Sequence, residues 1–289
     1  MLKMIKPIVN ISKIMDDYDT FVLGLSGVIT DGLNIKQEVV SALINLKKNG
    51  KTIVLLTNSA LRIGSIVNFL HSHNVPVALF SAAVSCGEIM HYKLKAKNKE
   101  IVGLGSNFYH IGSPSNLGVF QDLDYNRVSD ISKADFVYVS GADDKDDYID
   151  KYIPLLEHAA NMSIPFLCVN NDISTFMEGK VSLAAGAIAE QYAVLGGKII
   201  TIGKPDINLL KYALSDVKDY DKDRTVLIGD NLRTDIKLAN LADIHSILVS
   251  KGVHANFLGE GYIPDVAKTR ELATNYESYP NYVVSNFRW

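Results

Sequence analysis

The repeated alternation of short apolar runs with segments of helical period constrains this fold more than any other feature. Phe21–Leu25 is a continuous apolar run, which is typical of a parallel strand buried on both faces. Residues 36–49 carry apolar side chains at helical spacing, and Gly50 supplies a helix stop. Lys51–Leu56 is a second buried run. The alternation predicts an α/β fold with a doubly wound parallel sheet and functional loops at the carboxyl ends of its strands.

The same alternation continues along the chain and divides it into two units. We expect further strands at residues 76–80, 101–105, 135–140, 165–169, 198–202, 224–228 and 245–249, with an edge strand at 282–285. Helices are expected at residues 61–73, 84–97, 147–162, 183–195, 206–217, 234–242 and 265–275. The pattern starts afresh near residue 82 and returns to its first form near residue 199. We therefore expect a core domain of residues 1–82 and 199–289, with an inserted domain of residues 83–198.

The composition is that of a globular chain without a nucleic-acid footprint. Its 289 residues are 47% hydrophobic and 21% charged, which suits one large domain or two moderate ones. The formal net charge is −3, and no long run carries charge of one sign. A protein that binds nucleic acid usually shows a basic patch or stripe. We therefore expect no nucleic-acid partner.

Three features favour a cytoplasmic location. No run of 18 apolar residues occurs, so no membrane span is expected. The stretch Met1–Pro7 lacks both a sustained apolar segment and a small-residue cleavage site, which argues against a signal peptide. The two cysteines, Cys86 and Cys168, lack the spacing of metal ligands and fit a reducing compartment.

Four polar segments come after expected buried strands, and their order carries more information than any one of them. The first is the glycine-rich turn Gly24–Gly32. The second is Thr57–Asn58, which by itself is best explained as a helix cap. The third is Lys204 in a Gly-Lys-Pro sequence, which by itself is best explained as a surface lysine beside a helix N-terminus.

The fourth segment is the most specific. The apolar run Val226–Gly229 is followed by Asp230, and Asp235 lies five residues further on. Two carboxylates at a strand end suit Mg²⁺, a hard ion that prefers oxygen ligands and keeps several waters. The alternative places Asp230 in a turn and Asp235 in the first turn of a helix, where a carboxylate is also favourable. For a pattern of this length we favour the metal site.

Taken together, the four segments resemble the four motifs of the haloacid dehalogenase (HAD) superfamily of phosphohydrolases. Gly27–Val28 and Asp31–Gly32 match the frame of the first motif, D-x-D-G-V-x-x-D-G. Asn58 and Lys204 are 146 positions apart (204 minus 58), which leaves room for a cap domain between the second and third motifs. That placement defines the class II (C2) caps of the superfamily.

The resemblance covers nearly the whole chain. Within the inserted domain, residues 168–172, 185–187 and 196–198 resemble the class IIA branch, which contains nitrophenylphosphatases and nucleotide and sugar-phosphate phosphatases. This implies a Rossmann-like HAD core, an inserted α/β cap domain and a pocket for a small phosphorylated metabolite. A homodimer stays open, because cap-mediated dimers are known in the branch.

The family reaction is Mg²⁺-dependent hydrolysis of a phosphomonoester, and the resemblance implies a role for each matching residue. The Thr57 hydroxyl and the backbone N–H of Asn58 would hold the phosphoryl group, and Lys204 would neutralise its charge. Mg²⁺ would be held by Asp230, by Asp235 and by the main-chain carbonyl of Ser26. The cap residues that would close over the leaving group and set specificity are Asn170, Asn171 and Asp172.

The first motif departs from the family at the two positions that carry the chemistry. Gly24 and Ser26 stand where the family has the aspartate that attacks phosphorus and the aspartate that acts as acid and base. Gly24 has no side chain, and the Ser26 hydroxyl is a poor acid or base without a neighbouring base. Loss of the nucleophile lowers kcat on the order of 10⁶-fold in subtilisin. Asp31 is disfavoured as a substitute nucleophile, because its position normally carries another aspartate.

Two classes of function therefore stay open. One is an impaired Mg²⁺-dependent phosphomonoesterase, and the other is a non-catalytic protein that binds a phosphorylated ligand or a partner on a phosphatase scaffold. Gly24 and Ser26 favour the second class. Loss of two negative groups beside Lys204 would make the pocket more positive. We expect weakened Mg²⁺ binding, with retained binding of phosphate or a phosphomonoester.

Two other signals carry no function at this stage. Gly103 and Gly105 follow an apolar run, but Phe108 stands where a dinucleotide-binding fingerprint needs its last glycine. His110 has no partner that the sequence identifies, and we interpret it as structural.

Overall fold

Seven parallel strands form the largest sheet among the described residues. The structure, a computed structural model, describes residues 4–99, 101–177, 180–259 and 261–289, so the first three residues of Met1–Pro7 lie outside the described residues. The order across this core sheet is β1 (Lys6–Pro7), β14 (Tyr282–Val284), β13 (His245–Val249), β12 (Thr225–Gly229), β2 (Thr20–Leu23), β3 (Thr52–Thr57) and β4 (Ala82–Ser85). Each neighbouring pair is parallel. The predicted parallel α/β sheet is confirmed.

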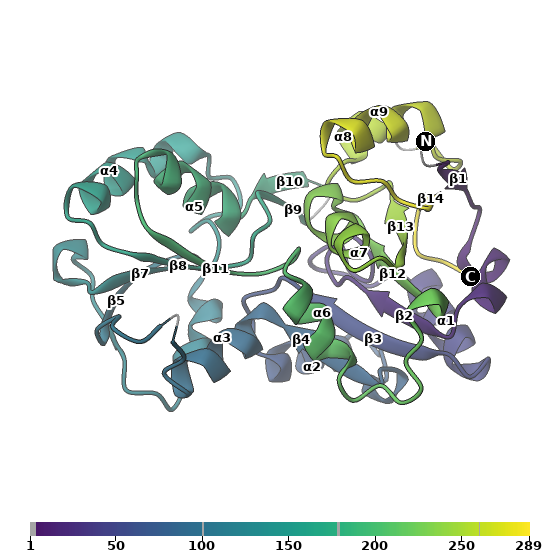
Figure 1. The fold of residues 1–289 in the computed structure, drawn as a ribbon, viewed down its shortest axis with the longest axis horizontal. Coiled ribbons are helices and arrows are strands. Elements are labelled where there is room, and N and C mark those ends of the chain that lie inside the picture. The colour runs from purple at the N-terminus through teal and green to yellow at the C-terminus, as the bar shows by residue number, and fades with distance from the viewer. Residues whose placement is uncertain (1–3, 100, 178–179, 260) are drawn as a thin grey trace.

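A second parallel sheet lies to one side of the core sheet (Figure 1). Its order is β11 (Ile199–Ile202), β8 (Phe166–Val169), β7 (Phe136–Val139), β5 (Asn107–Ile111) and β6 (Asn126–Arg127). An antiparallel hairpin, β9 (Ser174–Met177) with β10 (Lys180–Leu183), lies between the two sheets in Figure 1. Both chain ends lie on the core side, away from the second sheet.

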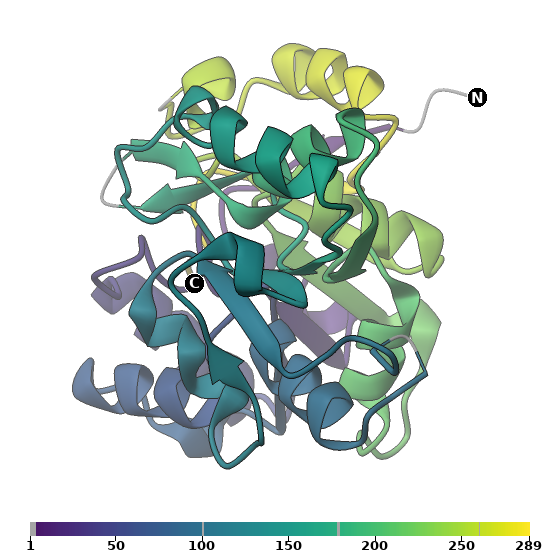
Figure 2. The same ribbon diagram turned by 90° about the vertical axis from the view of Figure 1, so that its left-hand side faces the viewer.

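Helices cover both sheets, and all but the one at residues 255–258 lie in segments where the sequence predicts a helix. They are α1 (Gln37–Lys48), α2 (Ile63–Ser72), α3 (Cys86–Lys95), α4 (Ile153–Asn161), α5 (Ala185–Val194), α6 (Ile207–Leu214), α7 (Lys237–Leu241), α8 (Ala255–Leu258) and α9 (Val266–Asn275). Figure 2 shows α4 and α5 together over the second sheet. No helix among the described residues combines the length and apolar character needed to cross a membrane.

The alternation of side chains along β2 separates two hydrophobic clusters. Phe21 points into one of them, together with Leu43 of α1. Val22 points into the other, together with Leu210 of α6. This second cluster continues without a break to Phe136 of the smaller sheet. The two sheets are therefore joined by packed side chains as well as by chain connections.

Two expected strands are wrong. Residues 76–80 form a short 3₁₀ turn at Val77–Leu79, and the strand that pairs with β3 comes later, at β4. Pro76 has no backbone N–H to offer a ladder, and the apolar run there packs without one. Residues 101–105 form turns with a single bridge between Val102 and Leu104, because Gly103 takes a positive φ of 96°.

Two expected strands exist but occupy other places. Residues 282–285 were expected at the edge, yet β14 lies between β13 and the two-residue strand β1. Residues 198–202 were expected in the core, yet β11 pairs with β8 of the second sheet. Strand β4, in contrast, begins at residue 82 and belongs to the core sheet through Ser85. The apolar runs predict strands, whereas the partner of each strand depends on the connections.

Candidate functional site

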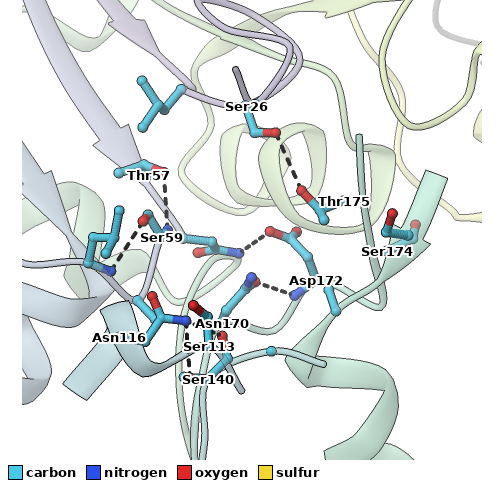
Figure 3. Close-up of a pocket in the computed structure, with 18 of the residues that line it drawn as sticks. Ser26, Thr57, Ser59, Ser113, Asn116, Ser140, Asn170, Asp172, Ser174 and Thr175 are labelled. Atoms are coloured by element: carbon cyan, nitrogen blue, oxygen red, sulfur yellow. Dashed lines mark hydrogen bonds between the residues drawn. The ribbon is translucent and has the colours of Figure 1, made fainter. Parts of the chain in front are cut away.

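A cavity of about 590 Å³ lies where the carboxyl ends of the two sheets face each other. Core-sheet residues in its wall follow β2, β3 and β12 and include Ser26, Thr57, Asn58, Asp230 and Asp235. Residues from the second sheet follow β5, β7, β8 and β11 and include Ser113, Ser140, Asn170, Asp172 and Lys204. Figure 3 shows side chains from both sheets around this space. Most of the residues singled out from the sequence thus meet in one cavity.

Lys204 and Asp235 form a buried ion pair at the floor of the cavity. The Lys204 Nζ lies 2.5 Å from Asp235 Oδ1, and their side chains are only 6% and 5% exposed. The ammonium group also donates to the carbonyl oxygen of Leu56 at 3.3 Å. Burial acts to lower the pKa of Lys204, but the carboxylates of Asp235 and Asp172 raise it above its usual value. Lys204 therefore stays positively charged.

Asn58 connects three segments of the chain. Its Oδ1 accepts hydrogen bonds from the Lys204 backbone N–H at 2.7 Å and from the Cys86 thiol at 3.3 Å. Its Nδ2 donates to Asp172 Oδ2 at 3.1 Å. Thr57 beside it accepts the Ser59 backbone N–H at 3.1 Å, which leaves the hydroxyl proton of Thr57 for another acceptor.

Asp172 brings a carboxylate from the second sheet into the core loops. Its oxygens accept hydrogen bonds from Asn58, from Asn231 Nδ2 at 3.0 Å and from the Thr234 hydroxyl at 2.7 Å. Burial raises the pKa of this carboxyl, and the lysine and the hydrogen bonds oppose that shift only in part. Lys204 consequently faces Asp172 as well as Asp235. The charge of Lys204 is therefore opposed by two carboxylates other than the two aspartates that the first motif lacks.

The neighbours of Asp172 have different surroundings. Asn170 lines the cavity, takes a positive φ of 98° and accepts the Asp172 backbone N–H through Oδ1 at 2.8 Å. Asn171 points elsewhere: its Nδ2 donates to the Gly203 carbonyl at 3.2 Å, and it lines a different cavity. Asn170 and Asn171 thus shape the loop that positions Asp172.

Asp230 is held by close backbone approach. Its Oδ2 accepts the Val253 backbone N–H at 2.9 Å. A Cβ atom added to Gly27 would lie 2.0 Å from this oxygen, and one added to Gly252 would lie 2.3 Å away, so both positions require glycine. Burial, followed by the charge of Asp235, raises the pKa of Asp230 to about 8.

Few carboxylate oxygens at this site are free to bind a magnesium ion. Both oxygens of Asp235 are engaged, one by Lys204 and one by the Asn231 backbone N–H at 3.2 Å. Asp230, in contrast, lines the cavity and uses only its Oδ2 in hydrogen bonds among the described residues. Those residues contain no group of three or more histidine, cysteine, aspartate or glutamate side chains arranged around a metal position. An ion here would depend on Asp230, on nearby Asp235 and on oxygens from water or ligand.

Gly24 leaves the end of β2 without a functional group. A Cβ atom placed on Gly24 would have ordinary contacts, with Val28 Cγ2 at 3.4 Å and Asp235 Oδ1 at 3.8 Å. The glycine is therefore not required by packing, and a side chain at this position would start beside the buried ion pair.

Ser26 anchors the hairpin instead of offering a free hydroxyl. Its Oγ donates to the Phe176 carbonyl at 3.1 Å and lies 3.4 Å from Thr175 Oγ1 (Figure 3). Asp31 does not line the cavity, and its Oδ1 accepts the backbone N–H groups of Leu33 and Asn34 in its own turn. Its contacts agree with the view that it is no substitute nucleophile.

Several residues of the site were missed from the sequence. Asn231 and Thr234 hold Asp172, and Asn231 directly follows Asp230, so its position was a usable signal. The polar wall on the cap side comes from Ser113, Asn116 and Ser140, which follow strands of the second sheet without any motif. The hairpin strands are four residues each and give no periodic signal.

Comparison with known proteins agrees with this geometry. A family model described as HAD-hydrolase-like matches residues 201–288. A hydrolase of the haloacid dehalogenase-like family from Brucella suis superposes with a TM-score of 0.80 at 26% identity, covering 96% of this chain and 98% of that one. A 4-nitrophenylphosphatase from Thermotoga maritima superposes with a TM-score of 0.63 at 26% identity, covering 94% and 96%. The family model covers the last part of the chain, and the superpositions show that the whole chain has the fold of HAD-like hydrolases.

Two relatives found by sequence are similar to this chain over most of their length. The 4-nitrophenylphosphatase of Schizosaccharomyces pombe is 24% identical over 287 residues, which cover 90% of this chain and 95% of that protein. A 5′-nucleotidase of Bacillus subtilis is 24% identical over 245 residues, which cover 83% and 90%. The structural relatives are of the class IIA type, and the HAD core with a cap domain is the architecture described above.

Proposed function

We propose that this HAD-like protein binds a small phosphorylated metabolite and does not perform the covalent hydrolysis of its family. The observation that carries the proposal is the end of β2, where Gly24 supplies no nucleophile beside the Lys204–Asp235 pair. Ser26 donates its hydroxyl proton to Phe176, and Asp31 is engaged in its own turn. These contacts leave the attack on phosphorus without a positioned group.

Groups suited to bind a phosphoryl group remain in the cavity. The Thr57 hydroxyl and the buried charge of Lys204 lie in its wall, at the end of β3 and in the loop after β11. The backbone N–H of Asn58 is the third donor implied by the family motif. Because Lys204 also faces Asp235 and Asp172, these donors alone do not balance a phosphate dianion.

Magnesium would supply the missing positive charge. Asp230, with Asp235 beside it, would hold the ion, and water and phosphate oxygens would complete its shell. A bound cation would also offset the cost of burying the ionised Asp230 carboxyl, whose pKa is raised when no cation is bound. Since Asp235 is committed to Lys204, we expect weak Mg²⁺ binding that becomes stronger when phosphate is present.

The second candidate is a slow Mg²⁺-dependent phosphomonoesterase, and the names of the relatives favour it. The proteins matched by sequence include a 4-nitrophenylphosphatase and a 5′-nucleotidase. If this chain kept their chemistry, a group other than Gly24 would have to attack phosphorus.

Phosphate release tests the two candidates directly. We would assay 4-nitrophenyl phosphate, nucleoside monophosphates and sugar phosphates with Mg²⁺, using the natural chain, Gly24→Asp and Gly24→Asp/Ser26→Asp. Gly24→Asn/Ser26→Asp is the matched control, because it has the same side-chain volume at position 24 without the nucleophilic carboxylate. The proposal expects release only from variants that carry Asp at position 24, since only they supply a carboxylate nucleophile and a Cβ atom at this position meets ordinary contacts.

Turnover by the natural chain above an Asp230→Ala control would overturn the non-catalytic proposal. Calorimetry with inorganic phosphate supplies the binding half of the test. We expect phosphate to bind in the presence of Mg²⁺ and to bind much more weakly in EDTA. A natural chain that binds no phosphate under either condition would contradict the proposal as well.

A further inference from the structure

The cap-side wall of the cavity contains a polar cluster that the phosphate site does not use. Ser140 Oγ lies 2.8 Å from His110 Nε2 and accepts a hydrogen bond from Asn116 Nδ2 at 3.2 Å. Ser140 is 5% exposed, and both Ser140 and Asn116 line the cavity (Figure 3). His110 follows no strand end and lies within β5, behind the wall.

The cluster is held rigidly. The His110 ring stacks on the buried Tyr138 ring with a centroid distance of 5.3 Å. The Tyr138 hydroxyl donates to the Asn116 carbonyl at 3.3 Å, and Asn116 Nδ2 also donates to the Ser140 carbonyl at 3.3 Å. A Cβ atom on Gly112 would lie 2.3 Å from Ser140 Oγ, so the glycine allows this hydroxyl to sit against the backbone.

The position of the proton on His110 can be deduced from one ring nitrogen that has no hydrogen-bond partner. His110 Nδ1 is buried and has no hydrogen-bond partner among the described residues. A buried N–H without an acceptor is rarer in proteins than an under-used acceptor, which favours the tautomer with the proton on Nε2. Burial also lowers the pKa of His110 to about 4, so the ring carries one proton at neutral pH. The Nε2–H group then donates to Ser140.

This assignment fixes the direction of the Ser140 hydroxyl. A serine hydroxyl accepts two hydrogen bonds and donates one. Its two acceptor sites are filled by His110 and Asn116, so Ser140 must donate its own proton. Its available protein acceptor is the Ile111 carbonyl at 3.5 Å, which is at the outer limit of a hydrogen bond. A ligand oxygen in the cavity would be a better acceptor.

We propose that Ser140, positioned by His110 and Asn116, is a specificity-determining donor that binds a neutral oxygen on the alcohol part of a phosphorylated polyol. The inference rests on the proposed function, because that function places the phosphoryl group at the opposite, core side of the cavity. Asp143 and Asp144 also line the cap side, so an uncharged hydroxyl suits this wall better than a carboxylate. Asn170 and Ser113, both in the same wall, add polar rather than apolar surface.

Matched ligands separate this contact from phosphate binding. We would titrate the full chain with Mg²⁺ and inorganic phosphate, then with linear polyol phosphates of three to six carbons and alkyl phosphates of the same length. The natural chain should bind the best polyol phosphate about three- to tenfold more tightly than its alkyl counterpart, as expected for one net hydrogen bond. Ser140→Ala should abolish this preference and leave the affinity for inorganic phosphate unchanged.

Two further variants test the positioning role. Ser140→Thr keeps the hydroxyl and should keep part of the preference for polyol phosphates. His110→Phe removes the Nε2–H donor while keeping an aromatic ring on Tyr138, and it should reduce the preference without changing phosphate affinity. Ser132→Ala is the control, since the Ser132 hydroxyl on the cap surface donates only to Asp130 in its own turn.

The outcomes distinguish this inference from the function on which it rests. Absence of phosphate binding by the natural chain would overturn the proposed function and this inference together. Phosphate binding with equal affinities for polyol and alkyl phosphates would overturn the inference alone. So would an equal loss for all ligands in Ser140→Ala, because that result indicates a structural serine.

Discussion

The ends of β2 and β12, neighbouring strands in the centre of the core sheet, carry opposite chemistry. The strands pair in register, with Leu23 opposite Ile228. After β2 the chain offers Gly24 and an engaged serine, whereas after β12 it offers two buried carboxylates, Asp230 and Asp235. Both ends face the same cavity, so the difference does not arise from exposure.

The difference lies in what each position supports. Asp235 neutralises Lys204 and accepts a backbone N–H, and Asp230 fills a space bounded by glycines. The Gly24 position supports no such network, and a Cβ there would meet only ordinary contacts. The absence of a polar side chain at Gly24 is therefore compatible with a stable fold, whereas removal of the carboxylates after β12 would disturb the interior. The packing and hydrogen bonds of Asp230 and Asp235 thus give both residues a structural role, whether or not the protein is a catalyst.

Asp235, which follows β12, and Gly24, which follows β2, form a matched pair for a stability test. Asp235→Asn should destabilise the protein by about 3 to 5 kcal/mol, because Lys204 would lose the buried carboxylate that it contacts directly and keep only the attraction of Asp172. Gly24→Ala, at the matched position on β2, should be neutral or stabilising by about 0.4 to 1 kcal/mol, since the site has room and the alanine restricts the unfolded chain. Urea unfolding of both variants measures the difference.

Similar stabilities for the two variants would mean that the charge of Asp235 contributes little and that the packing of its side chain suffices. Lys222→Met is a useful control, since the Lys222–Asp243 pair is on the surface and its removal should leave the unfolding midpoint nearly unchanged. A large effect in that control would point to a general effect of charge on stability.

The second prediction concerns the dependence of stability on pH. The folded protein raises the pKa of Asp230 from 3.8 to about 8, so between these values the folded state holds a proton that the unfolded state releases. The contribution of this group to stability is complete below pH 3.8 and is lost as the pH rises to about 8, with a slope of at most about 1.4 kcal/mol per pH unit. Asp230→Asn should remove this slope.

The measurement is urea unfolding at a series of pH values from 5 to 9 in EDTA. Gly24→Ala adds no titrating group and should follow the profile of the natural chain. If Asp230→Asn instead keeps the full slope, another group in the cavity binds the proton. Saturating Mg²⁺ should flatten the profile of the natural chain, since a bound cation favours the ionised carboxyl.

The sequence was sufficient to predict most of the core half of the cavity wall but only part of the cap half, where Asn170 and Asp172 line the cavity as expected and Ser113, Asn116 and Ser140 were missed. Thr57, Asn58, Asp230 and Asp235 were predictable because each follows an apolar run, and parallel strands bring their carboxyl ends to one edge. Lys204 was predictable from the family motif, although its strand joins the other sheet. These features depend on local periodicity and on one topological rule.

The contacts across the cavity could not be predicted in the same way. Asp172 meets Asn231 and Thr234 because the loop after β8 points into the core, and no periodic pattern encodes that direction. The same holds for Ser140 and His110, which are 30 positions apart and become neighbours only when β5 pairs with β7. The expectation of a more positive pocket stays a prediction, and it counted the aspartates absent after β2 without the Asp172 carboxylate that arrives from the cap.

A weaker effect on stability is expected at Ser26, which follows β2. Ser26→Ala should cost about 0.5 to 1.5 kcal/mol, because it removes the hydrogen bond that the hydroxyl donates to the Phe176 carbonyl. Ser26→Asp should loosen the hairpin further, since an ionised carboxylate can only accept hydrogen bonds and would face that carbonyl. Hydrogen exchange of the β9–β10 amides should therefore accelerate in the order natural chain, Ser26→Ala, Ser26→Asp, while the amides of β12 stay protected.

This order decides what the serine contributes. Faster exchange confined to the hairpin would mean that Ser26 anchors the hairpin from β2, which an acid–base aspartate at this position would oppose. Unchanged exchange in Ser26→Ala would mean that the hairpin is held by other contacts and that Ser26 is a neutral replacement. In the first case the hairpin of Gly24→Asp/Ser26→Asp would be looser than that of the natural chain. This variant should then turn over substrate more slowly than a site that has the same catalytic groups and a firmly held hairpin.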